Sequence, residues 1–289
     1  MSDESTRELD AAALDLFARK GYEGGPSIPQ AGPANAVKVR RVMQLTRDLC
    51  ARPFAELRIL DLGCGEGVYA IEAALGGADV LALDARRERM DEGARVAARH
   101  GLRNLRFVQQ DVRDATRETL GTFDVVYLLG LLYHLDAPEV FALLANVQDI
   151  CTQVLVIDTL ISLAAEAEVE WRGEVYQGRR HREHEDDDDA GVRRSRLLRS
   201  IDNTFAFRFT RGSLLRAVHA AGFMSVLECH VPFEPGKGDD RITVVALKGA
   251  PVRLAAYPWV NGLTEREIAR ALLPDEGMSP RPVARCGDV

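Results

Sequence analysis

The stretch RILDLGCGEGVYA, residues 58 to 70, limits what this chain can fold into more than any other. An apolar run typical of a buried strand ends in Asp61 and passes directly into a turn that contains Gly63, Gly65 and Gly67. Glycine permits positive φ and leaves no side chain between the backbone and a ligand. This pattern is typical of the first strand and helix of a doubly wound α/β sheet, which binds its ligand where the strands end.

The same alternation of strand and helix continues to about residue 160. Continuous apolar runs with helical segments between them indicate a parallel sheet that is covered on both faces. The expected strands are LRILDL (57–62), ADVLALD (78–84), NLRFVQQD (104–111), FDVVYLL (123–129) and CTQVLVID (151–158). Two later strands, 224–231 and 241–248, are joined by a short loop without a crossover helix, so this pair is antiparallel. We expect a seven-stranded, mostly parallel sheet whose last strand is antiparallel.

The segments outside this alternation suggest three further parts. Residues 1–56 are expected to form a helical cap, with helices at 10–20 and 36–50 and a Gly/Pro-rich loop between them. Tyr22, in that loop, can close over a bound ligand. Residues 159–209 show no clear period and are expected to be a long functional loop inserted in the domain of residues 57–249. A helix then starts at the N-cap Thr210 and stops at Gly222.

The C-terminal extension, residues 250–289, has a Pro-rich end and a helix opened by a Thr264/Glu267 capping box. Two roles are open for this extension: dimerisation of two copies of the chain, or closure of the acceptor site.

Composition excludes several classes of protein. The 289 residues are 46% hydrophobic and carry a formal net charge of −7, which argues against nucleic acid as the main partner. The polar start MSDESTRELD is no secretory signal, and no apolar run approaches the roughly 20 residues that a transmembrane helix needs. The five cysteines form no CxxC pair, which suits reduced thiols rather than disulfides or a zinc site. We expect a cytoplasmic protein without a membrane partner.

Three acids stand where the first three strands end. The glycine spacing does not fit the dinucleotide pattern G-x-G-x-x-G, and the Gly-Lys-Ser/Thr ending of a P-loop is absent. Asp61 suits a cationic group of the ligand. Asp84 can accept hydrogen bonds from both hydroxyls of a ribose. Asp111 can accept from an adenine amino group while the Val112 backbone serves a ring nitrogen.

The motifs LDLGCGEG, LALDA, QQDVRD and FDVVYLLGLLYHL occur in the order found in class I S-adenosylmethionine (SAM)-dependent methyltransferases. The chain resembles that superfamily over about residues 57–160, and its sheet resembles the Rossmann-like methyltransferase fold to about residue 248. The resemblance implies SAM as cofactor and S-adenosylhomocysteine as product. The cofactor-binding residues that it implies are Asp61, Gly63, Cys64, Gly65, Asp84, Ala85, Asp111, Val112 and Leu129.

The segment LGLLYHLDAP follows the fourth strand, where the transferred methyl group lies. It lacks the Asn/Asp-Pro-Pro-aromatic motif of many nitrogen methyltransferases, which argues for another acceptor atom. Tyr133 and His134 are the catalytic candidates. His134 can take a proton from an acceptor hydroxyl near neutral pH, or it can only shape the crevice through hydrogen bonds.

The insertion is expected to recognise the acceptor. It resembles a stretch of bacterial methyltransferases that act on saccharides and other small metabolites, which makes Trp171, Tyr176 and Asn203 candidate acceptor contacts beside Tyr22. Trp171 can instead be a core anchor, and Asn203 a turn-former. HREHEDDDD, residues 181–189, is a solvated acidic run or a metal site with His181 and His184, and we expect no metal.

We therefore predict a SAM-dependent methyltransferase that methylates oxygen on a small hydroxylated metabolite or sugar. Two alternatives stay open. GLLYHL also resembles tRNA wobble-uridine carboxymethyltransferases, which use a carboxylated SAM. A non-catalytic SAM-binding or regulatory subunit is the third hypothesis, and the intact acids and glycines argue against it.

Overall fold

In the computed structural model, residues 31–230 and 238–251 are described, and of residues 31–36 only the backbone. The chain divides into two units, residues 1–250 and 251–289, and the described elements all belong to the first. No helix in this part of the chain is both long enough and apolar enough to cross a membrane.

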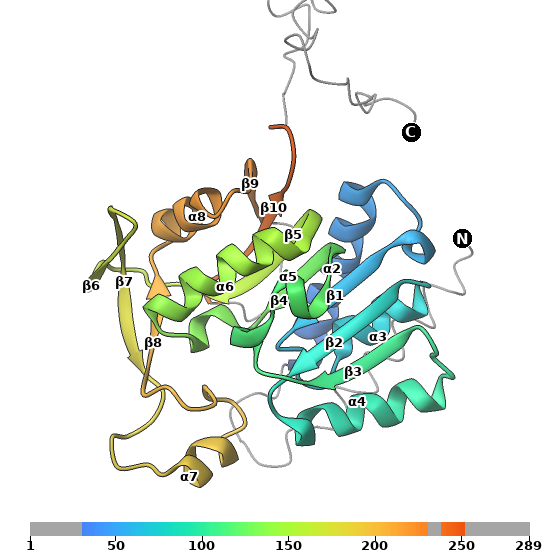
Figure 1. The fold of residues 1–289 in the computed structure, drawn as a ribbon, viewed down its shortest axis with the longest axis horizontal. Coiled ribbons are helices and arrows are strands. Elements are labelled where there is room, and N and C mark those ends of the chain that lie inside the picture. The colour runs from blue at the N-terminus through green and yellow to red at the C-terminus, as the bar shows by residue number, and fades with distance from the viewer. Residues whose placement is uncertain (1–30, 231–237, 252–289) are drawn as a thin grey trace, which may run out of the picture. The chain divides into compact units, whose positions relative to one another are not determined.

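A seven-stranded sheet forms the centre of this unit, in the order β3-β2-β1-β4-β5-β10-β9 (Figure 1). Every pairing is parallel except those of β10, which is antiparallel to both of its neighbours. The strands are β1 (Arg58–Leu62), β2 (Asp79–Asp84), β3 (Leu105–Gln109), β4 (Phe123–Leu129), β5 (Cys151–Leu160), β9 (Ser225–Cys229) and β10 (Arg241–Leu247). The predicted fold class is confirmed, with the last strand antiparallel.

Helices cover both faces of the sheet. Successive residues of a strand point to opposite faces, so each buried strand contributes side chains to an apolar core on either side. In β1, Ile59 packs into one apolar core and Leu60 into the other. On the Ile59 side lie α2 (Ala31–Cys50), α3 (Val68–Leu75) and α4 (Arg87–Arg99). On the Leu60 side lie α5 (Arg117–Leu120), α6 (Ala137–Ile150) and α8 (Arg211–Ala220). Single 3-10 turns occur at η1 (Phe54–Glu56), η2 (Val112–Asp114) and η3 (Leu132–His134).

The helix expected at 36–50 begins five residues earlier, at Ala31, inside the segment that we expected to be a loop. The helix after Thr210 starts as predicted, since the Thr210 side chain accepts a hydrogen bond from the Ser213 backbone N–H. The helix expected at 10–20, Tyr22 and the capping box of the C-terminal extension lie outside the described residues.

The insertion is not the irregular loop that we predicted from its lack of period. It forms a second, antiparallel sheet in the order β6-β7-β8, which packs against α6 (Figure 1). Its elements are β6 (Ala167–Trp171), β7 (Glu174–Arg182), α7 (Ala190–Ser195) and β8 (Phe205–Phe209). A period of two is present, because Tyr176 and Gly178 are buried while Gln177 is exposed. Arginines on both faces of β7 hide that period from a hydropathy pattern.

A buried ionic network ties α2 to the centre of the sheet. The fully buried Asp158 carboxylate, on β5, lies 3.3 Å from Lys38 Nζ and 2.5 Å from an Arg241 guanidinium nitrogen, and accepts a hydrogen bond from Thr243 Oγ1 at 2.9 Å. Burial raises the pKa of Asp158, but the charges of Arg241 and Lys38 lower it further, so the net shift is downward. The carboxylate is therefore ionised and neutralises Arg241.

Candidate active site

The glycine turn after β1 is held tightly against β2 and β3. Gly63, Gly65 and Gly67 all have positive φ, between 56° and 73°. A Cβ on Gly67 would lie 2.5 Å from the ring of Phe107, so a side chain cannot be added there without moving that ring. The backbone N–H groups of Gly63 and of the next residue, Cys64, donate to the Leu83 carbonyl, which fixes the turn to β2.

Asp61 lies beneath this turn with 1% of its surface exposed. Burial, and next the charge of Asp84, raise the pKa of Asp61 to about 7. One of its oxygens, Oδ2, is buried and has no hydrogen-bond partner in the described part of the chain. A buried carboxylate oxygen without a partner is costly, and a cationic ligand would satisfy it.

Asp84 ends β2 and is 7% exposed. Its Oδ2 accepts a hydrogen bond from the Gly65 N–H at 2.9 Å, and its Oδ1 accepts one from the Arg86 N–H at 2.8 Å. These bonds orient the carboxylate at the edge of the glycine turn. Each oxygen has a second lone pair, so the carboxylate keeps capacity for ligand hydroxyls.

Asp111, after β3, is engaged by Arg113. Its Oδ1 accepts from the Arg113 backbone N–H and Nε, and its Oδ2 lies 2.7 Å from Arg113 Nη2. Burial raises the pKa of Asp111, but the hydrogen bonds from Arg113 lower it more. Arg113 also bonds Glu139 on α6 and Asp202 in the insertion, so it joins three elements around this strand end. Val112 is buried in η2, and Leu129 is partly buried at the end of β4.

Tyr133 and His134 stand in η3, just after β4, with ring centroids 4.3 Å apart. Nδ1 of His134 lies 3.1 Å from Oε1 of Glu183, which is 2% exposed. Burial raises the pKa of Glu183, but the hydrogen bond and charge of His134 lower it more, so Glu183 is ionised. A carboxylate can only accept, so Nδ1 carries the hydrogen, and Nε2 is the ring nitrogen that can accept a proton when the ring is neutral.

Glu183 and Asn203 hold this pair in place from the insertion. The other Glu183 oxygen accepts a hydrogen bond from the Ser200 N–H at 2.9 Å. The Asn203 side-chain amide donates to the His134 carbonyl at 2.9 Å. Asn203, predicted as an acceptor contact, thus contacts the catalytic candidate. Sequence analysis missed Glu183, because it lies within HREHEDDDD among solvent-exposed acids and its partner is 49 positions away.

Similarity to known proteins agrees with this arrangement. Residues 59–153 match the methyltransferase domain family. The match places a methyltransferase domain at residues 59–153 of this chain. A ubiquinone biosynthesis O-methyltransferase from Vibrio campbellii is 37% identical over 81 residues, 28% of this chain and 34% of that protein. The protein of the same name from Bartonella tribocorum is 27% identical over 154 residues, 49% of this chain and 60% of that protein. The chain thus spans about a third to three fifths of these curated relatives.

Solved structures share the fold of the methyltransferase domain. The N-terminal domain of EvdMO1, determined in the presence of S-adenosylhomocysteine and D-fucose, matches with a TM-score of 0.58 and 24% identity, covering 86% of this chain and 98% of that one. A magnesium protoporphyrin IX methyltransferase from Synechocystis with bound SAM matches with a TM-score of 0.51 and 16% identity, covering 83% and 97%.

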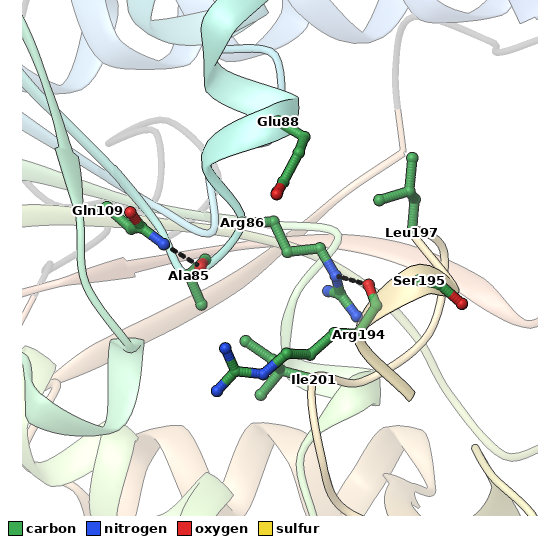
Figure 2. Close-up of a pocket in the computed structure, with 8 residues that line it drawn as sticks. All are labelled: Ala85, Arg86, Glu88, Gln109, Arg194, Ser195, Leu197 and Ile201. Atoms are coloured by element: carbon green, nitrogen blue, oxygen red, sulfur yellow. Dashed lines mark hydrogen bonds between the residues drawn. The ribbon is translucent and has the colours of Figure 1, made fainter. Parts of the chain in front are cut away.

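A cavity of about 280 Å³ lies between the end of β2 and the α7 segment of the methyltransferase domain (Figure 2). Arg86 closes one side of it: its guanidinium donates to the Arg196 and Ser200 carbonyls at 3.2 and 2.9 Å. Ala85, a predicted cofactor residue, also lines the cavity, and its carbonyl accepts a hydrogen bond from Gln109. The lining residues are Ala85, Arg86, Glu88, Gln109, Arg194, Ser195, Leu197 and Ile201.

The structure does not bring two predicted acceptor contacts of the methyltransferase domain to the site. Trp171 stacks on Phe141 of α6 at 5.1 Å, and Tyr176 packs on the same ring at 4.8 Å with 3% of its surface exposed. Both side chains are anchors between the small sheet and α6. Packing on α6 accounts for both aromatic side chains, and their contact with the acceptor stays a prediction.

The side chains of HREHEDDDD have partners within the protein. His184 is buried, and its Nε2 lies 2.9 Å from the Ser200 carbonyl. The Asp189 side chain caps α7, and Asp188 pairs with Arg196. Within residues 31–230 and 238–251, no group of three or more His, Cys, Asp or Glu side chains could hold a metal ion.

Proposed function

We propose that this protein is a SAM-dependent methyltransferase that methylates oxygen on a small hydroxylated metabolite or sugar. The observation that carries the proposal is the buried, unpartnered Oδ2 of Asp61 beneath the glycine turn. A ligand that places an ammonium group there would provide the missing partner, and SAM has such a group on its methionine part.

The other strand ends fit the remaining parts of this cofactor. Asp84, oriented by two backbone N–H groups, would hold the ribose hydroxyls. Ala85 and the cavity beside it would receive the nucleoside, with Val112 and Leu129 as further contacts. Asp111 would reach the adenine amino group only with a lone pair that Arg113 leaves unused. When bound, SAM supplies an electrophilic methyl group on a sulfonium sulfur.

The His134–Glu183 pair supports oxygen as the acceptor atom. Nε2 of His134 would take the proton of the acceptor hydroxyl as the new O–CH₃ bond forms and the S–CH₃ bond breaks. Glu183 would stabilise the resulting imidazolium and keep the ring in one orientation. General-base catalysis of this kind contributes about 10²- to 10⁴-fold in rate. The curated relatives named above are O-methyltransferases, and D-fucose was present with the EvdMO1 domain, which supports a hydroxylated acceptor.

The acidic net charge of −7 supports a small-molecule acceptor rather than nucleic acid, and the proposal keeps a cytoplasmic location. Formation of a homodimer through the C-terminal extension stays a prediction, because residues 252–289 lie outside the described part.

Calorimetric titration with SAM and S-adenosylhomocysteine tests the proposal. We expect binding by the wild type and an affinity lower by roughly 1.5 to 3 kcal/mol for Asp84→Ala, which loses hydrogen bonds to a charged group. Asp79→Ala, at the exposed opposite end of β2, is the matched control and should bind normally. No binding to well-folded wild-type protein would overturn the proposed function. Unchanged affinity of Asp84→Ala would place the ribose elsewhere.

A further inference from the structure

One face of the small sheet carries two arginines side by side. Arg179 on β7 is in register with Arg208 on β8, so the two side chains leave the sheet on the same face. The next pair on that face is His181 with Ala206. The opposite face packs on α6 through Tyr176 and Phe209, among others, and carries Arg180 further along β7.

Neither arginine forms an ion pair with an acid in the part of the chain that the structure describes. The Nε atoms of Arg179 and Arg208 are buried and make no hydrogen bond within the described residues. Two acids act on Arg208 electrostatically, Glu183 and Asp240, but neither forms an ion pair with it or with Arg179 there. Both Glu183 oxygens are already used by His134 and Ser200.

This arrangement is unfavourable for the empty protein. Like charges directly opposite each other on two strands destabilise a sheet, and a half-buried cation without a counter-ion adds to the cost. Burial, and next the charge of Arg179, lower the pKa of Arg208. Burial and the charge of Arg208 likewise lower the pKa of His181. The described part of the chain supplies no negative charge that would balance the two arginines.

The pair lies next to the proposed catalytic residues. The Arg208 guanidinium carbon is 5.8 Å from the centre of the Tyr133 ring, which in turn is 4.3 Å from the His134 ring. Arg241 also lies over the Tyr133 ring, at 6.0 Å, but it forms an ion pair with Asp158. Among the described residues, the arginine near Tyr133 that has no ion pair, Arg208, is therefore on the insertion side.

We propose that Arg179 and Arg208 bind an oxyanion group, a carboxylate or a phosphate, carried by the methyl acceptor. Arginine presents a planar fork of N–H donors that matches two oxygens of either group. The acceptor would thus be a hydroxylated acid or a phosphorylated metabolite, anchored by its anion while its hydroxyl faces His134. This inference rests on the proposed function, because it assigns the substrate class of the same site.

The test measures anion binding to protein saturated with S-adenosylhomocysteine, so that the cofactor site is filled and verified first. Thermal unfolding is followed while sodium phosphate or sodium acetate replaces sodium chloride at constant ionic strength. We expect a saturable rise of the unfolding temperature with at least one of the two anions, and the preferred anion distinguishes a phosphorylated acceptor from a carboxylic acid. In Arg208→Gln and Arg179→Gln the apparent affinity for that anion should fall at least tenfold. Arg180→Gln is the matched control, because Arg180 is on the same strand but on the other face.

Two further readouts separate the possible failures. Without anion, Arg208→Gln should unfold at no lower temperature than the wild type, because the repulsion between the two arginines is relieved.

A cofactor affinity of Arg208→Gln within about twofold of wild type supports the inference, and a tenfold loss would assign the arginines to the cofactor instead. Absence of any anion effect in cofactor-loaded wild type, or an equal effect in Arg208→Gln, would overturn the inference while the proposed function stands. Absence of cofactor binding would overturn both.

Discussion

At the scale of single residues, the contact between His134 and Glu183 gives the sharpest test of mechanism. Glu183→Gln keeps the size of the side chain but removes the negative charge that stabilises a protonated His134. We expect kcat to fall roughly tenfold or more, a part of the usual contribution of a general base. Affinity for S-adenosylhomocysteine should stay unchanged, because Glu183 has no contact with the glycine turn. Steady-state kinetics and calorimetry measure the two effects.

The matched control is Glu185→Gln, an exposed acid two positions further along the chain. It should leave kcat as in the wild type. A normal kcat for Glu183→Gln would show that Glu183 only anchors Ser200.

Single residues were predictable from the sequence where they stand at the end of a strand. Asp61, Asp84 and Asp111 could be found because each follows an apolar run in a parallel sheet. Glu183 and the pair Arg179/Arg208 could not, since their roles depend on contacts across the small sheet and with η3.

At the scale of elements, Arg86 helps to hold the α7 segment beside the cavity at the end of β2. The Arg86 side chain donates to three carbonyls, those of Arg194, Arg196 and Ser200. We expect Arg86→Ala to loosen this segment, to speed tryptic cleavage at its arginines and to weaken S-adenosylhomocysteine binding roughly tenfold, by about 1.4 kcal/mol.

Arg87→Ala is the control for that variant, because the Arg87 side chain is exposed and, among the described residues, pairs only with Asp91. Limited proteolysis of both variants measures how firmly the α7 segment is held, and calorimetry measures their affinity for S-adenosylhomocysteine. Equal cleavage rates and affinities in the two variants would mean that α7 does not form a wall of the cofactor site.

Elements of the main sheet were predicted well because buried parallel strands are continuous apolar runs with helices between them. The boundaries of β4, at Phe123 and Leu129, are those expected. The small sheet was missed because the alternation of apolar and charged residues in β6, as in Glu168, Val169 and Glu170, extends over only five residues, and β7 carries arginines on both faces. Its stability comes from packing on α6, which local sequence does not reveal.

At the scale of the whole molecule, Asp61 links stability, pH and ligand binding. Its pKa is about 7 in the folded protein, against about 3.9 in an unfolded chain. Between these values the folded state keeps a proton that the unfolded state has lost. The contribution of Asp61 to stability is therefore fully present below about pH 4 and is lost as the pH rises through about 7.

A ligand ammonium beside the ionised carboxylate reverses this relation. We expect the affinity for S-adenosylhomocysteine to increase roughly tenfold between about pH 6 and 8, because only the ionised form of Asp61 attracts the ligand. In Asp61→Asn the rise should disappear, and the ligand-free protein should be more stable than the wild type at neutral pH, since the buried charge is gone. Other groups titrate in the same range, so the difference between the two proteins is the quantity to measure, by calorimetry and by chemical denaturation. If affinity rises equally with pH in both proteins, the ligand's cationic group does not lie at Asp61, and the observation on which the proposed function rests has another cause.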